Sequence, residues 1–214
     1  MAELNDNTSL TEVVNSALVQ IGDTPIKSLS DDNDGKAVCA RLVVEQCIRE
    51  VQCHHSACWE ELIRDDLLTM RSSPEQDKVF GAFVWNLPFQ WLSINGVFDA
   101  AGVYVPWRIY GNTLHTKKPA KVIRYVKFSD VPDEWSAELK NCVIDLLAAK
   151  LLGGIVKDYS ASKQAVEVFW QQTFPRWVGN RARNSQRTKP GYDGELSRYY
   201  PYEPTRPQIN TKEY

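Results

Sequence analysis

The sequence predicts an α+β protein: an antiparallel helical bundle of about four helices, a small inserted antiparallel β-sheet region and an extended C-terminal arm. Apolar residues recur at helical spacing toward both ends of the 214-residue chain. Short runs rich in β-branched and aromatic residues fill the middle, with turn signals between them. The last thirty or so residues are polar and contain several prolines and tyrosines. We therefore divide the chain into residues 1–66, 67–128, 129–183 and 184–214.

The first helix is expected over Leu10–Ile21, where apolar residues follow the i, i+3, i+4 rule. Gly22 should end this helix, because glycine readily adopts the left-handed conformation common after a helix C-terminus. An acidic loop at 30–34 then leads to a second helix, expected from about Gly35 to Trp59. A helix of that length would span the fold.

The middle of the chain predicts a small antiparallel sheet. The clearest turn is at Tyr110–Thr113, where Gly-Asn lies between two alternating runs and indicates a hairpin. The sheet is too short to form a large barrel, so we expect it to pack on the helices or to project from them. The expected strands are 79–85, 91–98, 103–110, 113–116 and 122–128.

Helical spacing returns after Asp130, and either Asp130 or Ser129 can cap a third helix. The glycine pair at 153–154 should turn the chain into a fourth helix that starts near Tyr159, so that the two form a tight hairpin. Pro175 is expected to kink the fourth helix or to begin a new turn. From 184 onward, prolines prevent an independent core, whereas tyrosines are favoured at interfaces, so we expect the arm to become ordered against another subunit.

Composition argues against several classes of protein. Twenty-five basic residues balance twenty-seven acidic ones, which is unlike a protein that coats DNA or RNA. The N-terminus has neither the basic nor the apolar region of a secretory signal. The most apolar stretch, 142–156, is interrupted by charges and glycines and is too short to span a membrane, so no membrane anchor is predicted. Reduced thiols are expected for the five cysteines.

The residue types suited to metal binding are densest near the expected end of the second helix. Cys47, His54 and Cys58 would share one stripe of a helix and could hold zinc. No clear fourth ligand accompanies them, and helical cysteines are commonly small core residues. We therefore predict neither a metal nor a cofactor.

Two further sets of residues leave other functions open. Glu60, Glu61 and Asp65 are the carboxylates that a virion-associated peptidoglycan hydrolase could use, although runs of adjacent acids are usually solvated. The basic cluster between Arg176 and Lys189 could contact phosphates in a nucleic-acid-binding module, or acidic protein surface. No glycine-rich phosphate loop is present. No residue is predicted to be catalytic.

Several segments occur in an order that resembles one protein family. IGDTP at 21–25 precedes the acidic loop and the long helix; WNLPFQWL at 85–92, YGNTLHT at 110–116 and LLAAKLLGG at 146–154 follow. Over roughly residues 9–185 the chain resembles the podophage head-to-tail adaptors, the tail tubular protein A family. One departure is that the family's usual Pro-x-Asp is Pro88-Phe89-Gln90 here, without the acid.

The resemblance implies a non-enzymatic structural protein of the virion tail, a head-tail connector assembled in the host cytoplasm. Such adaptors form a homo-oligomeric ring, typically a dodecamer, between the portal protein and the tail nozzle. The genome passes through the channel during ejection, with only transient, non-specific contact with DNA. In the family the helical part and the arm engage the portal, while the sheet region faces the nozzle and, where present, the tail fibres.

We assign candidate contact residues on this basis. The expected portal-binding residues of the arm are Arg183, Arg187, Tyr192, Tyr199, Tyr200 and Tyr202. The expected nozzle- or fibre-facing residues of the sheet are Trp85, Trp91, Trp107 and Tyr110.

Overall fold

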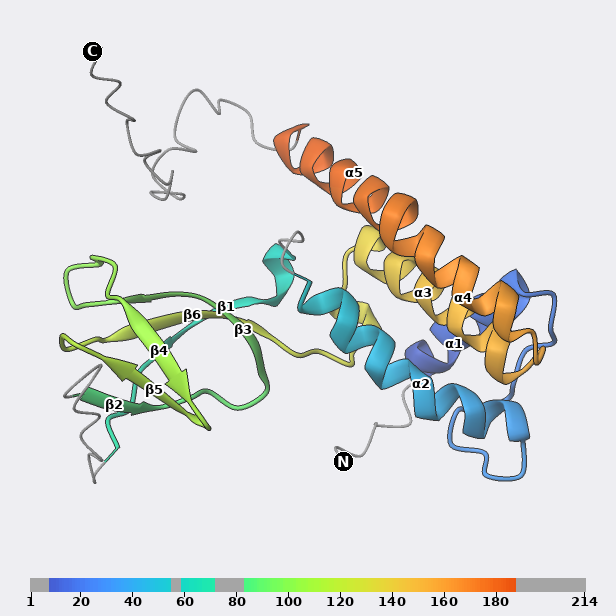
Figure 1. Cartoon of the computed structure of the whole chain (residues 1–214), viewed down its shortest axis with the longest axis horizontal. Coiled ribbons are helices and arrows are strands. Elements are labelled where there is room, and N and C mark those ends of the chain that lie inside the picture. Colours follow the sequence, from blue (N-terminus) through green and yellow to red (C-terminus); the bar gives the residue numbers. More distant parts are fainter. Residues whose placement is uncertain (1–7, 55–58, 72–82, 188–214) are drawn as a thin grey trace, which may run out of the picture.

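A computed structural model describes residues 8–54, 59–71 and 83–187. The chain forms a helical body and a sheet module that lie side by side (Figure 1). The helices of the body are α1 (Thr8–Gln20), α2 (Gly35–Gln52), α3 (Ala137–Gly154), α4 (Tyr159–Val168) and α5 (Phe174–Arg187). The sheet module is inserted between α2 and α3, and its strands are β1 (Ile63–Leu67), β2 (Phe83–Asn86), β3 (Trp91–Phe98), β4 (Trp107–Tyr110), β5 (Thr113–Thr116) and β6 (Val122–Lys127).

α3 is the centre of the helical body, since it contacts α1, α2, α4 and α5. Its side chains are apolar around most of its circumference, which is typical of a helix inside a core. Among its fully buried residues are Leu139, Leu146, Leu147 and Leu151. The N-cap of α3 is Ser136, whose hydroxyl accepts a hydrogen bond from the Leu139 N–H at 3.3 Å, and not the expected Asp130 or Ser129.

The end of α1 confirms the predicted glycine stop. Gly22 has a φ of 77°, which L side chains rarely adopt. The Gly22 N–H donates to the Val19 carbonyl and the Asp23 N–H donates to the Leu18 carbonyl, both at 3.0 Å. These two bonds are those of a Schellman motif, which satisfies carbonyls left unpaired at a helix end.

α2 ends at Gln52 and does not reach Trp59 as the sequence predicted. Past Gln52 the chain folds back, so that the fully buried Trp59 ring donates its Nε1–H to the Val51 carbonyl at 3.0 Å. Gln52 itself is buried and bonds the backbone of Ser129 twice. Its Nε2 donates to the Ser129 carbonyl at 2.7 Å, and its Oε1 accepts from the Ser129 N–H at 3.1 Å.

The expected hairpin between the third and fourth helices is confirmed. α3 ends at the predicted glycine pair and α4 begins at Tyr159 with Asp158 as its N-cap. A Cβ on Gly154 would lie 2.6 Å from the Cys39 sulfur, so a larger residue here would have to displace the Cys39 side chain of α2. The Ser162 hydroxyl then joins the two helices by donating to the Ala149 carbonyl at 2.8 Å.

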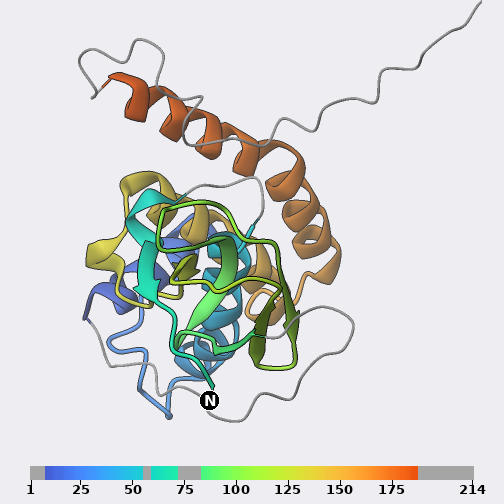
Figure 2. The same ribbon diagram turned by 90° about the vertical axis from the view of Figure 1, so that its left-hand side faces the viewer.

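α4 and α5 form one continuous helical rod. A π-helical turn, Phe169–Thr173, links them, and the Phe174 N–H donates to the Phe169 carbonyl, five residues earlier. The wider turn lies directly before Pro175, where an α-helix would otherwise lose a hydrogen bond and meet a ring clash. The rod therefore passes through Pro175 and reaches Arg187, so the expected arm boundary at 184 is corrected. The end of α5 projects past the rest of the body (Figures 1 and 2).

The sheet module holds two three-stranded antiparallel sheets, in the orders β1-β6-β3 and β2-β5-β4. The predicted hairpin joins β4 to β5, with Gly111 at a φ of 57° in its turn. β1 was not predicted, because its sequence IRDDL lacks the alternation of a half-buried strand. The module has a core of its own, made of Trp85, Val97, Val105, Leu114, Ala120, Ile123 and Tyr125.

The prediction of an antiparallel helical bundle with a small inserted sheet is wrong. The chain is a mixed α/β protein in which two sheets enclose a separate core. The bundle was overestimated because the expected long second helix stops at Gln52, and because α4 and α5 are one rod that runs past the body. The sheet was underestimated because β1, which starts before the expected boundary at 67, was missed.

Candidate interaction surface

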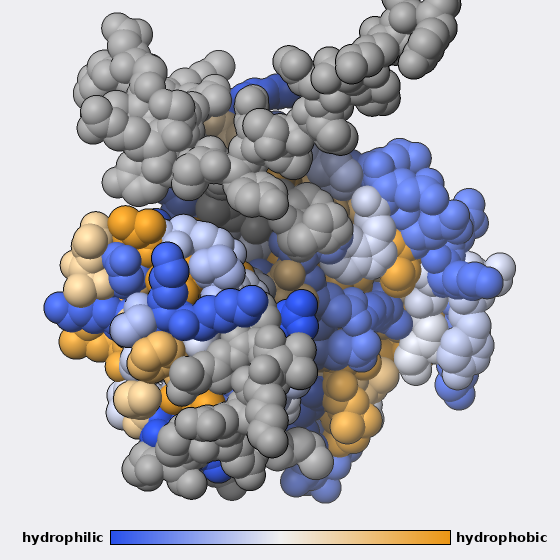
Figure 3. All heavy atoms as spheres, turned by 60° about the vertical axis from the view of Figure 1, so that its left-hand side comes forward, coloured by the Kyte–Doolittle hydropathy of each residue, from blue (hydrophilic) through white to orange (hydrophobic). Residues whose placement is uncertain are grey.

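The sheet module exposes several large apolar side chains. Phe89, in the turn between β2 and β3, is 84% exposed, and Leu67 at the end of β1 is 71% exposed. Figure 3, which brings this part of the molecule forward, shows apolar residues at the surface among charged ones. Other exposed large apolar residues among the described residues of the module are Met70, Val103, Tyr104 and Tyr110. A contiguous patch of such groups is typical of a contact surface.

The four aromatic residues expected to face the nozzle occupy different places. Trp85 is buried in the module core and donates its Nε1–H to the Thr116 hydroxyl at 2.9 Å. Trp91 and Trp107 are half-buried and pack against the same core. Only Tyr110 of the four is an exposed side chain, and it meets the His115 ring edge-on at 5.0 Å. The tryptophans therefore hold the module together, and of these four residues only Tyr110 is exposed.

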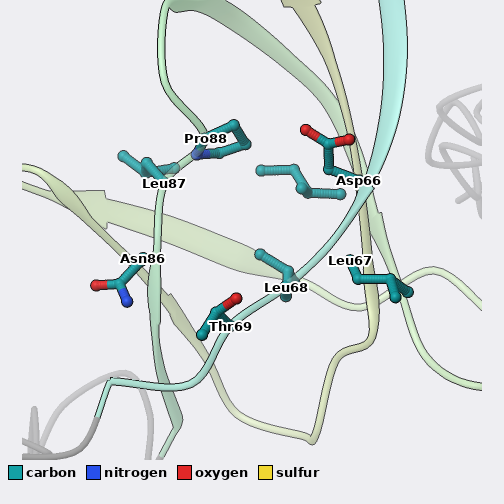
Figure 4. A pocket seen from close by; sticks show the side chains of 8 residues that line it. Asp66, Leu67, Leu68, Thr69, Asn86, Leu87 and Pro88 are labelled. Carbon is teal, nitrogen blue, oxygen red and sulfur yellow. The ribbon is translucent and has the colours of Figure 1, made fainter.

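A small pocket lies between the end of β1 and the turn after β2. Its volume is about 250 Å³, below the usual range for small-molecule sites and suited to a single side chain. Asp66 and Pro88 lie on opposite sides of it, with Leu68 between the two walls (Figure 4). The remaining lining residues are Leu67, Thr69, Asn86, Leu87 and Ile123.

The two acids of β1 have different partners. Asp65 accepts two hydrogen bonds from Arg124, at 2.7 and 2.6 Å, and this arginine holds the pKa of the carboxyl below its usual value. Asp66 accepts a hydrogen bond from the Tyr125 hydroxyl at 2.7 Å. Burial, together with this bond to a carboxylate, raises the pKa of Tyr125 to about 12. Of these two acids, Asp66 is the one that lines the pocket.

A polar cluster joins the sheet module to the helical body. The Arg181 guanidinium of α5 ion-pairs with Glu61, and it donates to the Ser136 hydroxyl at 2.7 Å. The Ser136 N–H also donates to Glu61, at 3.1 Å. Arg181 lies over the Trp59 ring, 5.3 Å from its centroid. We call these four residues the junction clamp. It ties the entry to β1, the start of α3 and the rod of α5 together.

The clamp gives a pH-dependent contribution to stability. Burial alone would raise the pKa of Glu61, but hydrogen bonds from Ser136 and the charge of Arg181 outweigh it and lower that pKa below its ordinary 4.5. Because the folded state then binds the proton more weakly than the unfolded state, this stabilisation is complete above pH 4.5 and lost as the pH falls through the folded pKa. The urea midpoint of the parent protein should fall as the pH is lowered from about 5 to about 3. We expect Glu61→Gln to make this fall smaller, because the substituted side chain no longer titrates.

Glu60→Gln, at the exposed neighbouring residue, is the control. It should leave the change of the urea midpoint with pH nearly the same as in the parent protein. If the urea midpoint changes equally with pH in the Glu61→Gln and Glu60→Gln proteins, Glu61 does not supply the pH-dependent stabilisation. Urea midpoints followed by tryptophan fluorescence at several pH values provide the measurement.

The carboxylates considered for a hydrolase are not gathered into one site. Glu61 is bound by Arg181 in the junction clamp, and Asp65 is bound by Arg124 in the sheet module. Glu60 is exposed at the start of the short turn before β1. The two paired acids therefore serve to join segments of the chain.

The residues considered for zinc do not form a metal site within the described part of the chain. Burial raises the pKa of the Cys47 thiol to about 12, which opposes the thiolate that zinc binds. The His54 ring stacks on Trp170 at 5.0 Å and lies 4.4 Å from the Phe174 ring. Cys58 lies outside the described residues. Within 8–54, 59–71 and 83–187, no group of three histidine, cysteine or acidic residues could hold a metal.

The basic cluster is divided by the fold. Arg181 belongs to the junction clamp, whereas Arg176 and Arg183 are exposed on the rod. Arg187 is the last residue of α5. The other expected portal-binding residues, Tyr192, Tyr199, Tyr200 and Tyr202, lie outside the described residues.

Sequence reasoning missed the exposed Phe89, the pocket beside Asp66 and the junction clamp. Phe89 did carry a signal, because an aromatic side chain in a turn after Leu-Pro has no strand face to bury it. Gln90, next to it, has a φ of 58°, and its carbonyl accepts from the Phe128 N–H at 2.8 Å, which fixes the turn. The pocket and the clamp join residues distant in sequence and carry no local signal.

Among the described helices, none combines the length and the apolar character needed to cross a membrane. Comparison with protein-family models and with curated proteins found no match to the chain.

Proposed function

We propose that the chain is a structural head-to-tail adaptor of a tailed bacteriophage, which forms a ring between the portal and the tail nozzle. The observation that carries the proposal is the division of the chain into two parts with different surfaces. The sheet module exposes apolar side chains, and the helical body carries the rod of α4 and α5, whose C-terminal end projects on the side of the sheet module (Figure 1). An adaptor needs different surfaces because it binds different partners above and below.

The order of sequence motifs supports the proposal further. IGDTP contains the Schellman stop of α1, YGNT forms the β4–β5 hairpin, and LLAAKLLGG is the C-terminal half of the central helix α3. These segments have structural roles in both parts of the molecule. A closed ring also needs two complementary flanks on each subunit, and the stiff helical body offers them.

The arm supplies the sharpest test. A protein ending at Arg187 keeps the whole of α5 and lacks only the tyrosine-rich segment that follows. We expect this truncation to weaken portal binding at least about tenfold, since buried aromatic residues dominate most protein interfaces. Sedimentation of mixtures with purified portal protein measures binding, and electron micrographs show whether stacked rings form.

A matched full-length control replaces Tyr214, near the end of the arm, with alanine and should bind nearly as the parent does. Replacing Tyr192, Tyr199, Tyr200 and Tyr202 together should reproduce the effect of truncation. Unchanged portal affinity in the truncated protein would overturn the role of the arm, and a solitary protein in every mixture would overturn the adaptor proposal itself.

A further inference from the structure

The pocket beside Asp66 lies where two strand pairings meet. Up to Leu68 the chain pairs with β6, and from Thr69 onward it pairs with β2 on its other side. Two hydrogen bonds of 3.0 Å, at Thr69 and Arg71, make the second pairing. Among the described residues, no backbone hydrogen bond joins β1 itself to the segment 86–88, and the pocket lies between these two segments (Figure 4).

The pocket combines apolar walls with one carboxylate. Leu68, Leu87 and Ile123 supply the apolar surface. Asp66 Oδ2 accepts a hydrogen bond from the Tyr125 hydroxyl at 2.7 Å, whereas Oδ1 of the same carboxylate accepts none within the described chain. An apolar hollow beside a carboxylate suits a long side chain that has an apolar stem and a cationic head.

The two arginines of the β1–β6 pair are occupied elsewhere. Arg124 donates to both carboxylate oxygens of Asp65. Arg64 Nη1 donates to two backbone carbonyls, at 2.7 and 2.9 Å. Asp66 forms no ion pair with any residue that the structure describes, so a cation that pairs with it must come from elsewhere.

The rim of the pocket favours a protein over a small free amine. Leu67, which lines the pocket, is 71% exposed, and Phe89, which directly follows the lining residue Pro88, is 84% exposed. The turn that carries Phe89 is held in place, since the Gln90 carbonyl accepts from the Phe128 N–H at 2.8 Å. A small cation would leave these two apolar side chains in water, whereas a protein segment can cover them.

We propose that the pocket binds an arginine side chain of a partner protein, whose guanidinium pairs with Asp66 and whose neighbouring apolar residues cover Leu67 and Phe89. Arginine suits the site better than lysine because its planar guanidinium is more weakly hydrated and can lie against an apolar wall while it donates to a carboxylate. The site belongs to the sheet module alone, so the proposal goes beyond the adaptor function and does not depend on the chain forming a ring.

The probe is the synthetic peptide acetyl-Leu-Arg-Phe-amide, titrated into the full-length protein and followed by amide-resolved NMR. We expect saturable shifts of the Leu68, Thr69 and Ile123 amides. The same peptide with citrulline, a neutral analogue of arginine, should bind about fivefold more weakly, the effect of one partly exposed ion pair. Putrescine, a small free dication, should bind at least about tenfold more weakly than the arginine peptide because it leaves the apolar rim uncovered.

Three variants separate the carboxylate from the rim. Asp66→Asn keeps an acceptor for Tyr125 and should abolish the preference for arginine over citrulline. Asp65→Asn is the matched control: it removes an acid that Arg124 already pairs, so the preference should stay at about fivefold. Phe89→Ala should weaken both peptides by the same factor, because both lose the same apolar contact.

Three results with the unaltered protein would overturn the proposal, and none needs a variant to fold. They are equal affinity for the arginine and citrulline peptides, no saturable shift at the residues that line the pocket, and putrescine binding as tight as that of the arginine peptide. None of them bears on the adaptor ring, which the mixtures with portal protein test separately.

Discussion

Arg181→Met is expected to lower the free energy of unfolding by about 2–4 kcal/mol, because it leaves the Glu61 carboxylate of the junction clamp without its cation. The side chains of the pair are only 16% and 19% exposed, so water replaces the lost partner poorly. The methionine stem keeps most of the contact with Trp59 and thereby limits the change to the polar group. Urea unfolding at pH 7 measures the loss.

A matched control is available on the surface of α2. Arg41 pairs with Asp32, whose side chain is 80% exposed, and Arg41→Met should change stability by no more than about 0.5 kcal/mol. The double variant Glu61→Gln with Arg181→Met should recover part of the loss, because no buried charge remains. Equal costs for the Arg181 and Arg41 substitutions would show that the clamp contributes no more than a surface ion pair.

Gln52→Glu is expected to destabilise the protein by about 2–4 kcal/mol at pH 7, because a buried carboxylate would face the Ser129 carbonyl that now accepts from the Gln52 amide. The cost should shrink toward pH 5. Burial raises the pKa of the new carboxyl, so the folded state binds the proton more tightly, and the protonated acid can donate to that carbonyl.

Gln52→Leu removes both hydrogen bonds and should cost a similar amount, with no such recovery at low pH. Gln164→Glu, at an exposed position of α4, is the control for the added charge. Urea midpoints of the four proteins at pH 7 and pH 5 provide the comparison. A Gln52→Glu protein that loses stability on acidification in parallel with the parent would refute the role given to this amide.

The parts of the fold that sequence predicted are those fixed within a few residues. Gly22 and Gly111 need a positive φ wherever the rest of the chain lies, so the end of α1 and the β4–β5 hairpin could be read directly. The end of α2 could not, because Gln52 binds Ser129, which lies 77 positions later. β1 was missed for the same reason, since its charged residues become a strand only by pairing with β6.

The surface was harder to predict than the fold. A tryptophan in a short strand can face a partner or a second sheet, and Trp85 became a core residue because its sheet packs against another. Residue type alone does not distinguish the two outcomes. The pocket combines Asp66, Asn86 and Ile123 from three separate segments, so it exists only once both sheets have assembled.

The double hydrogen bond between Gln52 and Ser129 has a consequence for how this architecture can diversify. The sheet module leaves the helical body just after Gln52 and returns at Ser129, so its two ends meet within one side-chain length. An insertion with adjoining ends can be exchanged without displacing its host, as loops with close ends tolerate domain insertion. A chimera carrying a foreign β insert should therefore keep its helical core only if it retains the residues next to the seam, because Trp59 and Phe128 pack in that core and Glu61 pairs with Arg181.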